Sequence, residues 1–520
     1  MKRARVPIFL IVPLVVLSLA VLGSRDRDRA RHTTTTAVGG ATAATLMPVA
    51  PPAGALSSTF FCPGGTGQPD GAADAFVLIA NPGDRALHAT VTVYPGAIDG
   101  DQAAAQAIAG LAPKATTVEV PARGRITVHL TDVQASPYNA ALVEVDGGEV
   151  AVEHRVTGKL GSDGGPCASA PSATWYLPSG SDNPGARELL SLFNPFPDDA
   201  VIDVAFVTSD GSRVPDRLGN YVVPGGHLVV LDVNKESPLH EQVATSITSV
   251  SGRLVVGRLQ SFDGSDPKHP AGMASTLAAP QPALVWTFPE GEVAEGIGEV
   301  YTVYNPGDAQ AEVDLEIALD DPDVNGTVDP ISVKVPPHAY VQVVMQDQGR
   351  VPPGVGHTVT VRSRNGVPVV PERAISAGAP ATRRGYAPAL GSPLVADRWL
   401  FADGRADAST AEWLIVVNPS PDSLVRFSVT ALAKGQPIPI DGLQQVEIRP
   451  GGRIAVEVGP HLSRPDLPLV VDGDGPLVVE RGLYGVGRPG ISLAVGIPLS
   501  SGLAVRPPHP PTTTSTTSAP

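Results

Sequence analysis

The segment "LIVVNPSPD" (Leu414–Asp422) decides the fold, because three similar segments recur along the chain. They read "VLIANPGD", "LSLFNPFPDD" and "YTVYNPGD", and their asparagines are 113, 111 and 113 residues apart at Asn81, Asn194, Asn305 and Asn418. Proline has no N–H for a sheet and favours an extended residue before it. Each segment is therefore predicted to end a strand and begin a turn.

Other landmarks keep the same spacing. An aromatic phrase precedes each Asn-Pro pair and begins at Phe60, Trp175, Trp286 or Trp399. Two strands joined at a proline follow, and each copy ends with an apolar strand: "VAVEHR", "LVVGR", "VVPER" or "LVVER". A fixed order of landmarks at a constant interval is the signature of an internal repeat, here of about 112 residues.

The residue pattern predicts an all-β fold. Valine-rich alternation such as "TVEVPARGRITVHL" is typical of half-buried strands, and 55 Gly and 54 Pro interrupt most stretches that could form a helix. An immunoglobulin-like sandwich needs about 100 residues, whereas a propeller blade needs about 40–50. We therefore predict four tandem immunoglobulin-like β-sandwiches at residues 57–168, 169–281, 282–394 and 395–505. The aromatic phrase could instead close the preceding unit, which would exchange strands between neighbours.

Both ends of the chain differ from the repeats. Basic residues precede the uncharged segment Val6–Gly23, which is the order of an export signal. We predict that residues 1–24 are a cytoplasmic stub and an uncleaved, single-pass signal anchor with the N-terminus inside; the alternative is a cleaved signal peptide and secretion. Residues 25–56 and the Pro/Thr-rich residues 506–520 are predicted to be a disordered spacer and tail, because they are too polar to bury a core.

The motifs W-Y/F-x-x-x-G, N-P, V-P-x-G and V-V-x-E-R together resemble a repeat of exported, membrane-anchored actinobacterial proteins of unknown function. The resemblance covers nearly everything between the anchor and the tail. It implies an extracytoplasmic location and a repeat architecture, and it implies no reaction. The first copy departs most, with Phe60 in place of Trp and Glu153-His154 in place of Glu-Arg.

Cys62 and Cys167 are the only cysteines and lie near the start and end of the first copy. Outside the cytoplasm a disulfide between them is the expectation, with free thiols or a metal site as alternatives.

Two recurring columns of residues carry competing interpretations. Trp175, Trp286 and Trp399 could stack on glycan rings, but tryptophan at one position in every copy is more typical of a core. A second column holds His154, Arg258, Arg373 and Arg481. Adjacent Glu and Arg on a strand face opposite sides, which argues against a catalytic pair. We expect these arginines to bond carbonyls or a carboxylate of the neighbouring unit.

The strongest metal candidate is "DDPDVNGTVD". Asp321, Asp323, Asn325 and Asp329 match positions 1, 3, 5 and 9 of a calcium loop, but Ser332 stands where the template has glutamate. The alternative is an acidic turn. We predict no other cofactor.

The formal charge of -15 argues against nucleic-acid binding. No H-E-x-x-H, G-x-S-x-G or phosphate-binding loop occurs in the sequence, so we predict a protein that is not an enzyme. The leading hypothesis is a cell-envelope scaffold, spacer or adhesion module whose partners are the membrane, envelope polysaccharide or other envelope proteins. The alternatives are a cell-wall glycan-binding module and, less favoured, an envelope hydrolase with its site in a divergent copy.

Overall fold

The computed structural model describes residues 36–37, 43–68, 71–266, 268–499 and 503–505. The predicted signal anchor, residues 1–24, and the predicted tail, residues 506–520, lie outside the described residues. Residues 37–520 belong to one compact unit, which contains all four copies of the repeat. Within the described ranges, no helix has both the length and the apolar character that a membrane crossing requires. We use the names repeat 1 to repeat 4 for residues 57–168, 169–281, 282–394 and 395–505.

Repeat 3 shows the basic unit most simply, as two four-stranded antiparallel sheets. One sheet has the order β19-β24-β21-β22 and the other has the order β23-β20-β25-β26. Its elements are β19 (Val285–Phe288), β20 (Ile297–Asn305), β21 (Ala311–Leu319), α6 (Pro322–Asn325), β22 (Ile331–Val335), β23 (Ala339–Val344), η3 (Met345–Gln348), β24 (His357–Ser363), β25 (Val370–Ala377) and β26 (Gly385–Leu390).

Repeats 1 and 2 contain the same succession of strands, with the short strand β13 added in repeat 2. Repeat 1 contains β2 (Ser58–Gly67), β3 (Asp74–Asn81), β4 (Leu87–Ile98), α3 (Gln102–Ile108), β5 (Lys114–Val120), β6 (Gly124–His129), α4 (Leu130–Val133), β7 (Ser136–Val145), β8 (Ala151–Gly158) and β9 (Gly161–Pro166). Repeat 2 contains β10 (Thr174–Leu177), β11 (Ala186–Asn194), β12 (Ala200–Thr208), β13 (Gly211–Arg213), η2 (Asp216–Leu218), β14 (Tyr221–Val223), β15 (His227–Asp232), α5 (Val233–Glu236), β16 (Ala244–Ser251), β17 (Val255–Phe262) and β18 (Gly272–Leu277).

Repeat 4 differs by carrying one long strand, β33, that takes part in both sheets. Its first part pairs with β27 and β29, and its second part pairs with β28 and β34. The elements are β27 (Leu394–Phe401), β28 (Thr410–Val417), β29 (Val425–Ala433), β30 (Gln436–Pro439), β31 (Val446–Ile448), β32 (Arg453–Glu457), β33 (Leu469–Gly485), β34 (Ile491–Val495), β35 (Ile497–Pro498) and β36 (Ala504–Val505); the short strand β1 (Thr36–Ala37) precedes the repeats.

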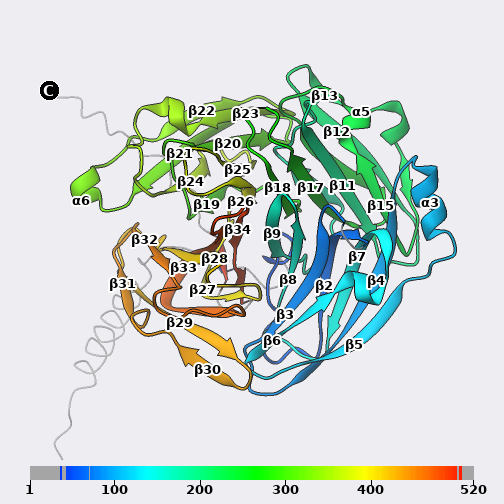
Figure 1. Ribbon diagram of the computed structural model, residues 1–520. Helices are drawn as coiled ribbons and strands as arrows, with labels where there is room; N and C mark the ends of the chain where they lie inside the picture. Colours follow the sequence, from blue (N-terminus) through cyan, green and yellow to red (C-terminus); the bar gives the residue numbers. More distant parts are fainter. Residues whose placement is uncertain (1–35, 38–42, 69–70, 267, 500–502, 506–520) are drawn as a thin grey trace, which may run out of the picture. The chain divides into compact units, whose positions relative to one another are not determined.

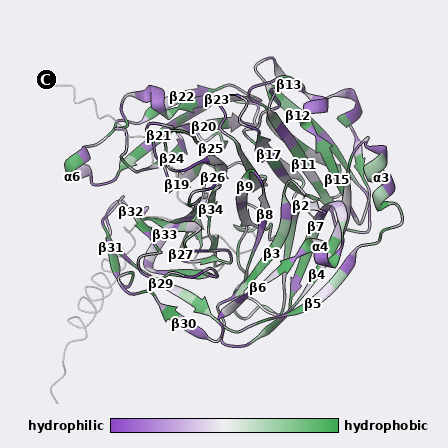
Figure 2. Cartoon of the chain, in the orientation of Figure 1, coloured by the Kyte–Doolittle hydropathy of each residue, from purple (hydrophilic) through white to green (hydrophobic). Residues whose placement is uncertain are grey.

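The aromatic phrase opens its own repeat. Strand β10 pairs with β16, β19 with β24, and β27 with β33, in each case within one repeat. The all-β fold is as predicted from the sequence, and each unit is sandwich-like, with two sheets that enclose a core. In Figure 2 the hydrophobic colour concentrates along the strands of these sheets.

Each tryptophan of the aromatic phrase is the centre of a repeat's core. Trp175, Trp286 and Trp399 are at most 1% exposed. Their indole N–H groups donate to main-chain carbonyls of Leu254, Val369 and Leu477 at 3.0, 2.9 and 3.1 Å. Since the ring is enclosed and its one polar atom is satisfied, the side chain fits a core position.

The asparagines of the Asn-Pro segments are buried, and their side chains bind main-chain groups on two sides. The Asn305 side-chain amide donates to the carbonyls of Ala309 and Val335 at 2.8 and 3.0 Å, and its Oδ1 accepts from the N–H of Gly307 at 3.0 Å. Asn81, Asn194 and Asn418 make the corresponding bonds. The asparagine therefore fixes the turn after its own strand to the end of a strand in the facing sheet.

The last strands of the four repeats meet around a common centre. β9 contacts β18, β18 contacts β26, β26 contacts β34, and β34 contacts β9. Figure 1 shows these four strands beside one another, with their repeats arranged around them. The repeats thus close a ring, in which repeat 4 contacts repeat 1 instead of continuing a linear series.

Repeats 1 and 2 are joined more closely than the sequence suggested. β15 of repeat 2 pairs in parallel with β4 of repeat 1, so one twelve-stranded sheet extends across the expected boundary. Gly96 lies opposite Leu228 there, and a Cβ on Gly96 would come within 2.5 Å of the Leu228 side chain. A side chain at position 96 would therefore collide with the Leu228 side chain, which favours glycine there.

Part of the predicted disordered spacer is ordered, which corrects that prediction. Met47 and Val49 are buried against repeat 4, and the N–H of Ala50 donates to the carbonyl of Pro498 at 2.9 Å. The Val49 N–H donates to Ser169 Oγ at 3.0 Å. The segment has few large apolar residues, but the ring of repeats supplies a surface against which they are buried.

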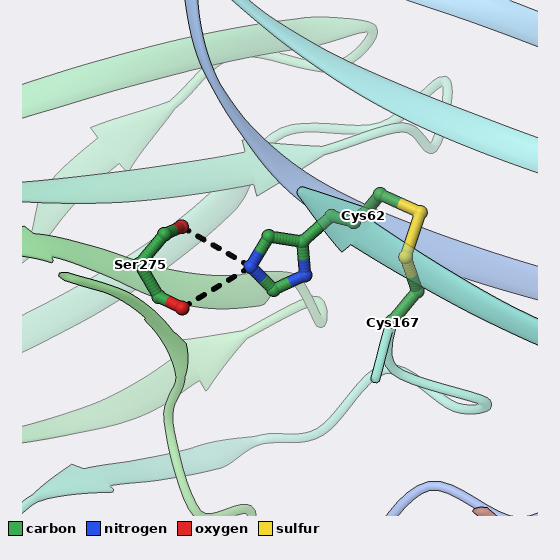
Figure 3. The surroundings of a disulfide bond; sticks show 4 residues. Cys62, Cys167 and Ser275 are labelled. Carbon is green, nitrogen blue, oxygen red and sulfur yellow. Dashed lines mark hydrogen bonds between the residues drawn. A yellow bond between two sulfur atoms is a disulfide. The ribbon is translucent and has the colours of Figure 1, made fainter. Parts of the chain in front are cut away.

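The predicted disulfide between Cys62 and Cys167 is present (Figure 3). It connects β2 to the residue just after β9, with a sequence separation of 105. Both cysteines are fully buried in the core of repeat 1.

Replacing both cysteines with alanine is expected to lower the free energy of unfolding by about 4 kcal/mol, because the disulfide closes a loop of roughly 100 residues in the unfolded chain. Urea unfolding of the wild type with and without reductant would measure the effect. The variant should be indifferent to reductant, and an unchanged midpoint in the variant would contradict the prediction.

Candidate functional site

Three of the four contacts between repeats share one arrangement, which we call the interface clamp. The Arg258 guanidinium of repeat 2 donates to Glu372 Oε1 of repeat 3 at 2.6 Å and to the carbonyl of Ser179 in its own repeat. The Ser179 N–H donates to the other oxygen of Glu372 at 3.0 Å. One carboxylate therefore binds both a guanidinium and a peptide group of the preceding repeat.

The clamp recurs at two further interfaces. Between repeats 3 and 4, Arg373 pairs with Glu480 at 2.6 Å, and the Glu290 N–H donates to Glu480 at 2.9 Å. Between repeats 4 and 1, Arg481 pairs with Glu153 at 2.8 Å, and the Asp403 N–H donates to Glu153 at 2.6 Å. The last of these closes the ring. The prediction that the arginines bond carbonyls and a neighbouring carboxylate is confirmed.

The paired arginines and glutamates of the clamp are at most 2% exposed. Burial alone would lower the pKa of Arg481, but Glu153 and Asp403 raise it above its ordinary value. A buried charge is tolerated only when it is paired and hydrogen-bonded. The geometry therefore makes each repeat depend on its neighbour for the partner of a buried charge.

The interface between repeats 1 and 2 is the exception, because both charges of the clamp are replaced together. His154 occupies the arginine position, and Gly257 occupies the position of the partner glutamate. A Cβ on Gly257 would lie 2.3 Å from Pro63 Cβ, so Pro63 occupies the space of the missing side chain. This interface is held instead by the shared sheet and by a contact of His154 with Ser275.

Sequence reasoning missed a second column of buried carboxylates. Glu188, Glu299 and Glu412 lie six residues before the repeated asparagines and are 0% exposed. Burial raises the pKa of Glu188 and of Glu412 to about 8, against the lowering effect of Arg258 and Arg481 respectively. The signal was available in the sequence, since three of the four copies carry glutamate at this position.

Replacing Arg481 with methionine is expected to lower the free energy of unfolding by about 3–5 kcal/mol, because it leaves Glu153 buried without its partner. The double variant Arg481→Met/Glu153→Gln should recover much of the loss, since it leaves no unpaired charge. Urea unfolding followed by tryptophan fluorescence would measure both.

Arg426→Met is the matched control, because Arg426 pairs with Glu447 on an exposed surface. Its loss is expected to stay below about 1 kcal/mol. Equal destabilisation by the two single variants would show that the clamp is not special.

A serine, a histidine and an aspartate meet at the centre of the ring, the residue types of a hydrolase triad. His154 Nε2 lies 3.1 Å from Ser275 Oγ and 3.3 Å from the Ser275 carbonyl. Dashed lines mark the two contacts to Ser275 in Figure 3. The Asp163 carboxylate accepts from the Ser275 main-chain N–H at 2.7 Å. These residues line a cavity of ≈ 80 Å³ together with Met47 and Trp286.

The arrangement does not match a working triad. A nitrogen that bonds a carbonyl must carry the proton, so Nε2 cannot also accept a proton from Ser275. Burial lowers the pKa of His154 to about 4, which makes it a weak base near neutral pH. The carboxylate holds the serine backbone and not the histidine ring, whereas a triad aspartate orients the imidazole.

Burial raises the pKa of Asp163 to about 7. Between pH about 4 and 7 the unfolded chain has lost this proton while the folded chain keeps it, so the free energy of unfolding falls as pH rises. Asp163→Asn removes this cost. Relative to the wild type, the variant is expected to gain up to about 4 kcal/mol between pH 4 and pH 8.

Thermal unfolding at several pH values would measure this gain. The exposed substitution Asp84→Asn is the control and is expected to show no such trend. A constant difference between Asp163→Asn and wild type across the range would contradict the prediction.

A larger pocket, of ≈ 470 Å³, lies between repeats 1 and 4. Basic side chains on both repeats line it: Arg155, Lys159, Arg405 and Arg488. Asp403 and Asp163 are the acidic residues in the lining. Burial alone would raise the pKa of Asp403, but Arg155, Arg481 and Arg125 hold it at about 2. The sequence did not predict this pocket, because its residues come from two repeats far apart in the chain.

The residues predicted to stack on glycans or to bind calcium do not form such sites in the structure. Trp175, Trp286 and Trp399 are enclosed in the cores, which argues against the glycan-stacking hypothesis because no ring face is left for a sugar. The calcium-loop residues do not converge. Asp321 precedes the single turn α6, where Pro322 favours a helical start. The exposed Asp323 carboxylate pairs with Arg449 at 3.3 Å.

Asn325 and Asp329 complete the predicted calcium set. The Asn325 amide donates to the Asp320 carbonyl at 2.6 Å, so it serves the local turn. Throughout the part of the chain that the structure describes, no three His, Cys, Asp or Glu side chains are grouped so that they could hold a metal ion.

Residues 30–236 match a family of unknown function (DUF5719). The match starts before repeat 1 and ends within repeat 2, and it agrees with the expectation of a family without an assigned activity. None of the curated proteins matches the chain.

Two solved structures are similar to part of the chain. One, described as Thermotoga maritima 1070, is 19% identical over 22% of this chain and 95% of its own, with a TM-score of 0.19. The other, the Anabaena sensory rhodopsin transducer, is 23% identical over 18% of this chain and 94% of its own, with a TM-score of 0.15. At these TM-scores the similarity carries no argument about fold or function.

Proposed function

We propose that this chain is a non-enzymatic protein of the cell envelope that acts as an interaction scaffold outside the cytoplasm, held at the membrane by its N-terminal segment. The observation that carries the proposal is the ring of repeats, in which buried interface clamps connect repeat 2 to 3, 3 to 4 and 4 to 1. Units fixed to one another in this way present surface loops and pockets in constant positions, which is what a scaffold needs.

The ring favours a scaffold over a spacer. Repeats that close on themselves add no length with each copy, whereas a spacer gains length from each unit. The disulfide favours a location outside the cytoplasm, where such bonds persist. Assignment of the sandwich-like units to the immunoglobulin-like class, and an actinobacterial source, remain part of the proposal.

The first property to test is the side of the membrane on which the repeats lie. Alkaline phosphatase fused to the C-terminus of the full chain is expected to be active, since this enzyme folds only where disulfides form. Cys62 and Cys167 should resist alkylation when the protein is denatured without reductant. Deleting residues 6–23 should abolish the phosphatase activity and make both thiols reactive in the same denaturing assay. An inactive fusion of the intact chain would contradict the proposed location.

The hydrolase alternative makes a separate prediction. Shortening of purified envelope polysaccharide by the full chain, abolished by Ser275→Ala, would contradict the non-enzymatic proposal. Unchanged polymer length is the expected result.

A further inference from the structure

We propose that the pocket between repeats 1 and 4 binds an oxyanion, the phosphate or carboxylate group of a small molecule. The inference goes beyond the scaffold proposal and does not depend on the cellular location. It rests on the charge balance of the pocket, on the basic side chains that lack a carboxylate partner, and on the reason that this interface is open.

The pocket has an excess of positive charge within a chain whose formal charge is -15. Asp403 is already engaged by Arg155 at 3.1 Å and by Arg125 at 3.4 Å. The other acidic residue, Asp163, is buried and binds the Ser275 N–H. Neither carboxylate is left to neutralise the basic side chains at the mouth of the pocket.

Two of those basic side chains have no carboxylate partner in the part of the chain that the structure describes. Among the described residues, no carboxylate forms an ion pair with Lys159 or Arg488, and both residues are exposed. The Arg488 guanidinium donates to Thr410 Oγ1 at 3.1 Å, which leaves further donors free. Two cations that converge on one pocket from different repeats are suited to the charge-assisted bonds that oxyanions form.

The pocket exists because this interface lacks the aromatic pair that fills the interface between repeats 2 and 3. There Phe262 and Tyr386 pack with ring centroids 4.8 Å apart. The corresponding positions, counted along the paired strands, are Gly485 in repeat 4 and Ser162 in repeat 1. Replacement of both rings by small residues leaves a volume that the basic residues surround.

Glycine also shapes the wall. Gly161 has a φ of +131°, and a Cβ there would lie 2.9 Å from Gly490 Cα in the facing turn. The hairpin ends of repeats 1 and 4 thus touch through their backbones, with Lys159 and Arg488 beside the contact. The volume of ≈ 470 Å³ lies within the range of about 300–1,000 Å³ typical of small-ligand sites. Hydroxyl groups of Thr157 and Thr410 add neutral bonding partners. The hydroxyls of Ser162 and Ser492 already donate to the carbonyls of Val156 and Gly164.

Calorimetric titration of the full chain would test the proposal, with inorganic phosphate, glucose 6-phosphate, glucuronate and glucose as probes. At least one anionic probe is expected to bind, more weakly as sodium chloride is raised, because salt screens exposed charges. Glucose alone should not bind. Binding of phosphates only or of glucuronate only would identify the group, and either result supports the proposal.

The double variant Lys159→Gln/Arg488→Gln is expected to weaken binding at least about tenfold, since each charge-assisted bond contributes substantially. Lys114→Gln/Arg213→Gln removes the same charge from exposed positions outside the pocket and should change affinity less than about twofold. Ser162→Tyr refills the pocket by analogy with Tyr386 and should abolish binding while unfolding remains cooperative. No binding of any anion by wild type, or equal binding by the pocket and control variants, would overturn the proposal.

Discussion

The interface clamp is the interaction on which the ring depends. A buried arginine in one repeat needs a carboxylate, and the carboxylate comes from the next repeat; a peptide group of the arginine's own repeat orients that carboxylate. Because an unpaired buried charge is costly, a contact between repeats that does not match arginine with glutamate would bury charges without partners. The pair specifies which surfaces meet, while the packed inner strands contribute the apolar area.

The interface between repeats 1 and 2, which lacks the clamp, obeys the same constraint that a buried charge needs a partner. His154 and Gly257 replace both partners, so no charge is left without its counterpart. Pro63 fills the space, and the sheet shared by repeats 1 and 2 supplies contacts that the other interfaces lack. The disulfide lies in the same repeat, which is also the one that departs most from the others in sequence. Repeat 1 thus lacks the interface clamp to repeat 2, but the shared sheet and the disulfide stabilise it instead.

Much of the architecture could be predicted because it depends on local chemistry. Proline and asparagine after an apolar run end a strand by their own backbone chemistry, and alternating valines predict strands. The disulfide could be predicted because the chain has only two cysteines and because disulfides persist outside the cytoplasm. The candidate sites were harder to predict. The tryptophan column had two interpretations, and only burial separated them. The acidic loop matched a calcium template by spacing, yet Pro322 starts a helical turn that the template does not include.

The sequence by itself determined the period of the repeat, the all-β class and the chemical type of the groups that bind the buried arginines. The period and the all-β class depend on residues close together in sequence, and the type of partner follows from the chemistry of a buried guanidinium. Only the tertiary structure decided that the series closes, that Glu153 is the partner of Arg481, and that Lys159 and Arg488 share a pocket. Ring closure joins residues more than 300 positions apart, and no local pattern encodes which two surfaces meet at that distance.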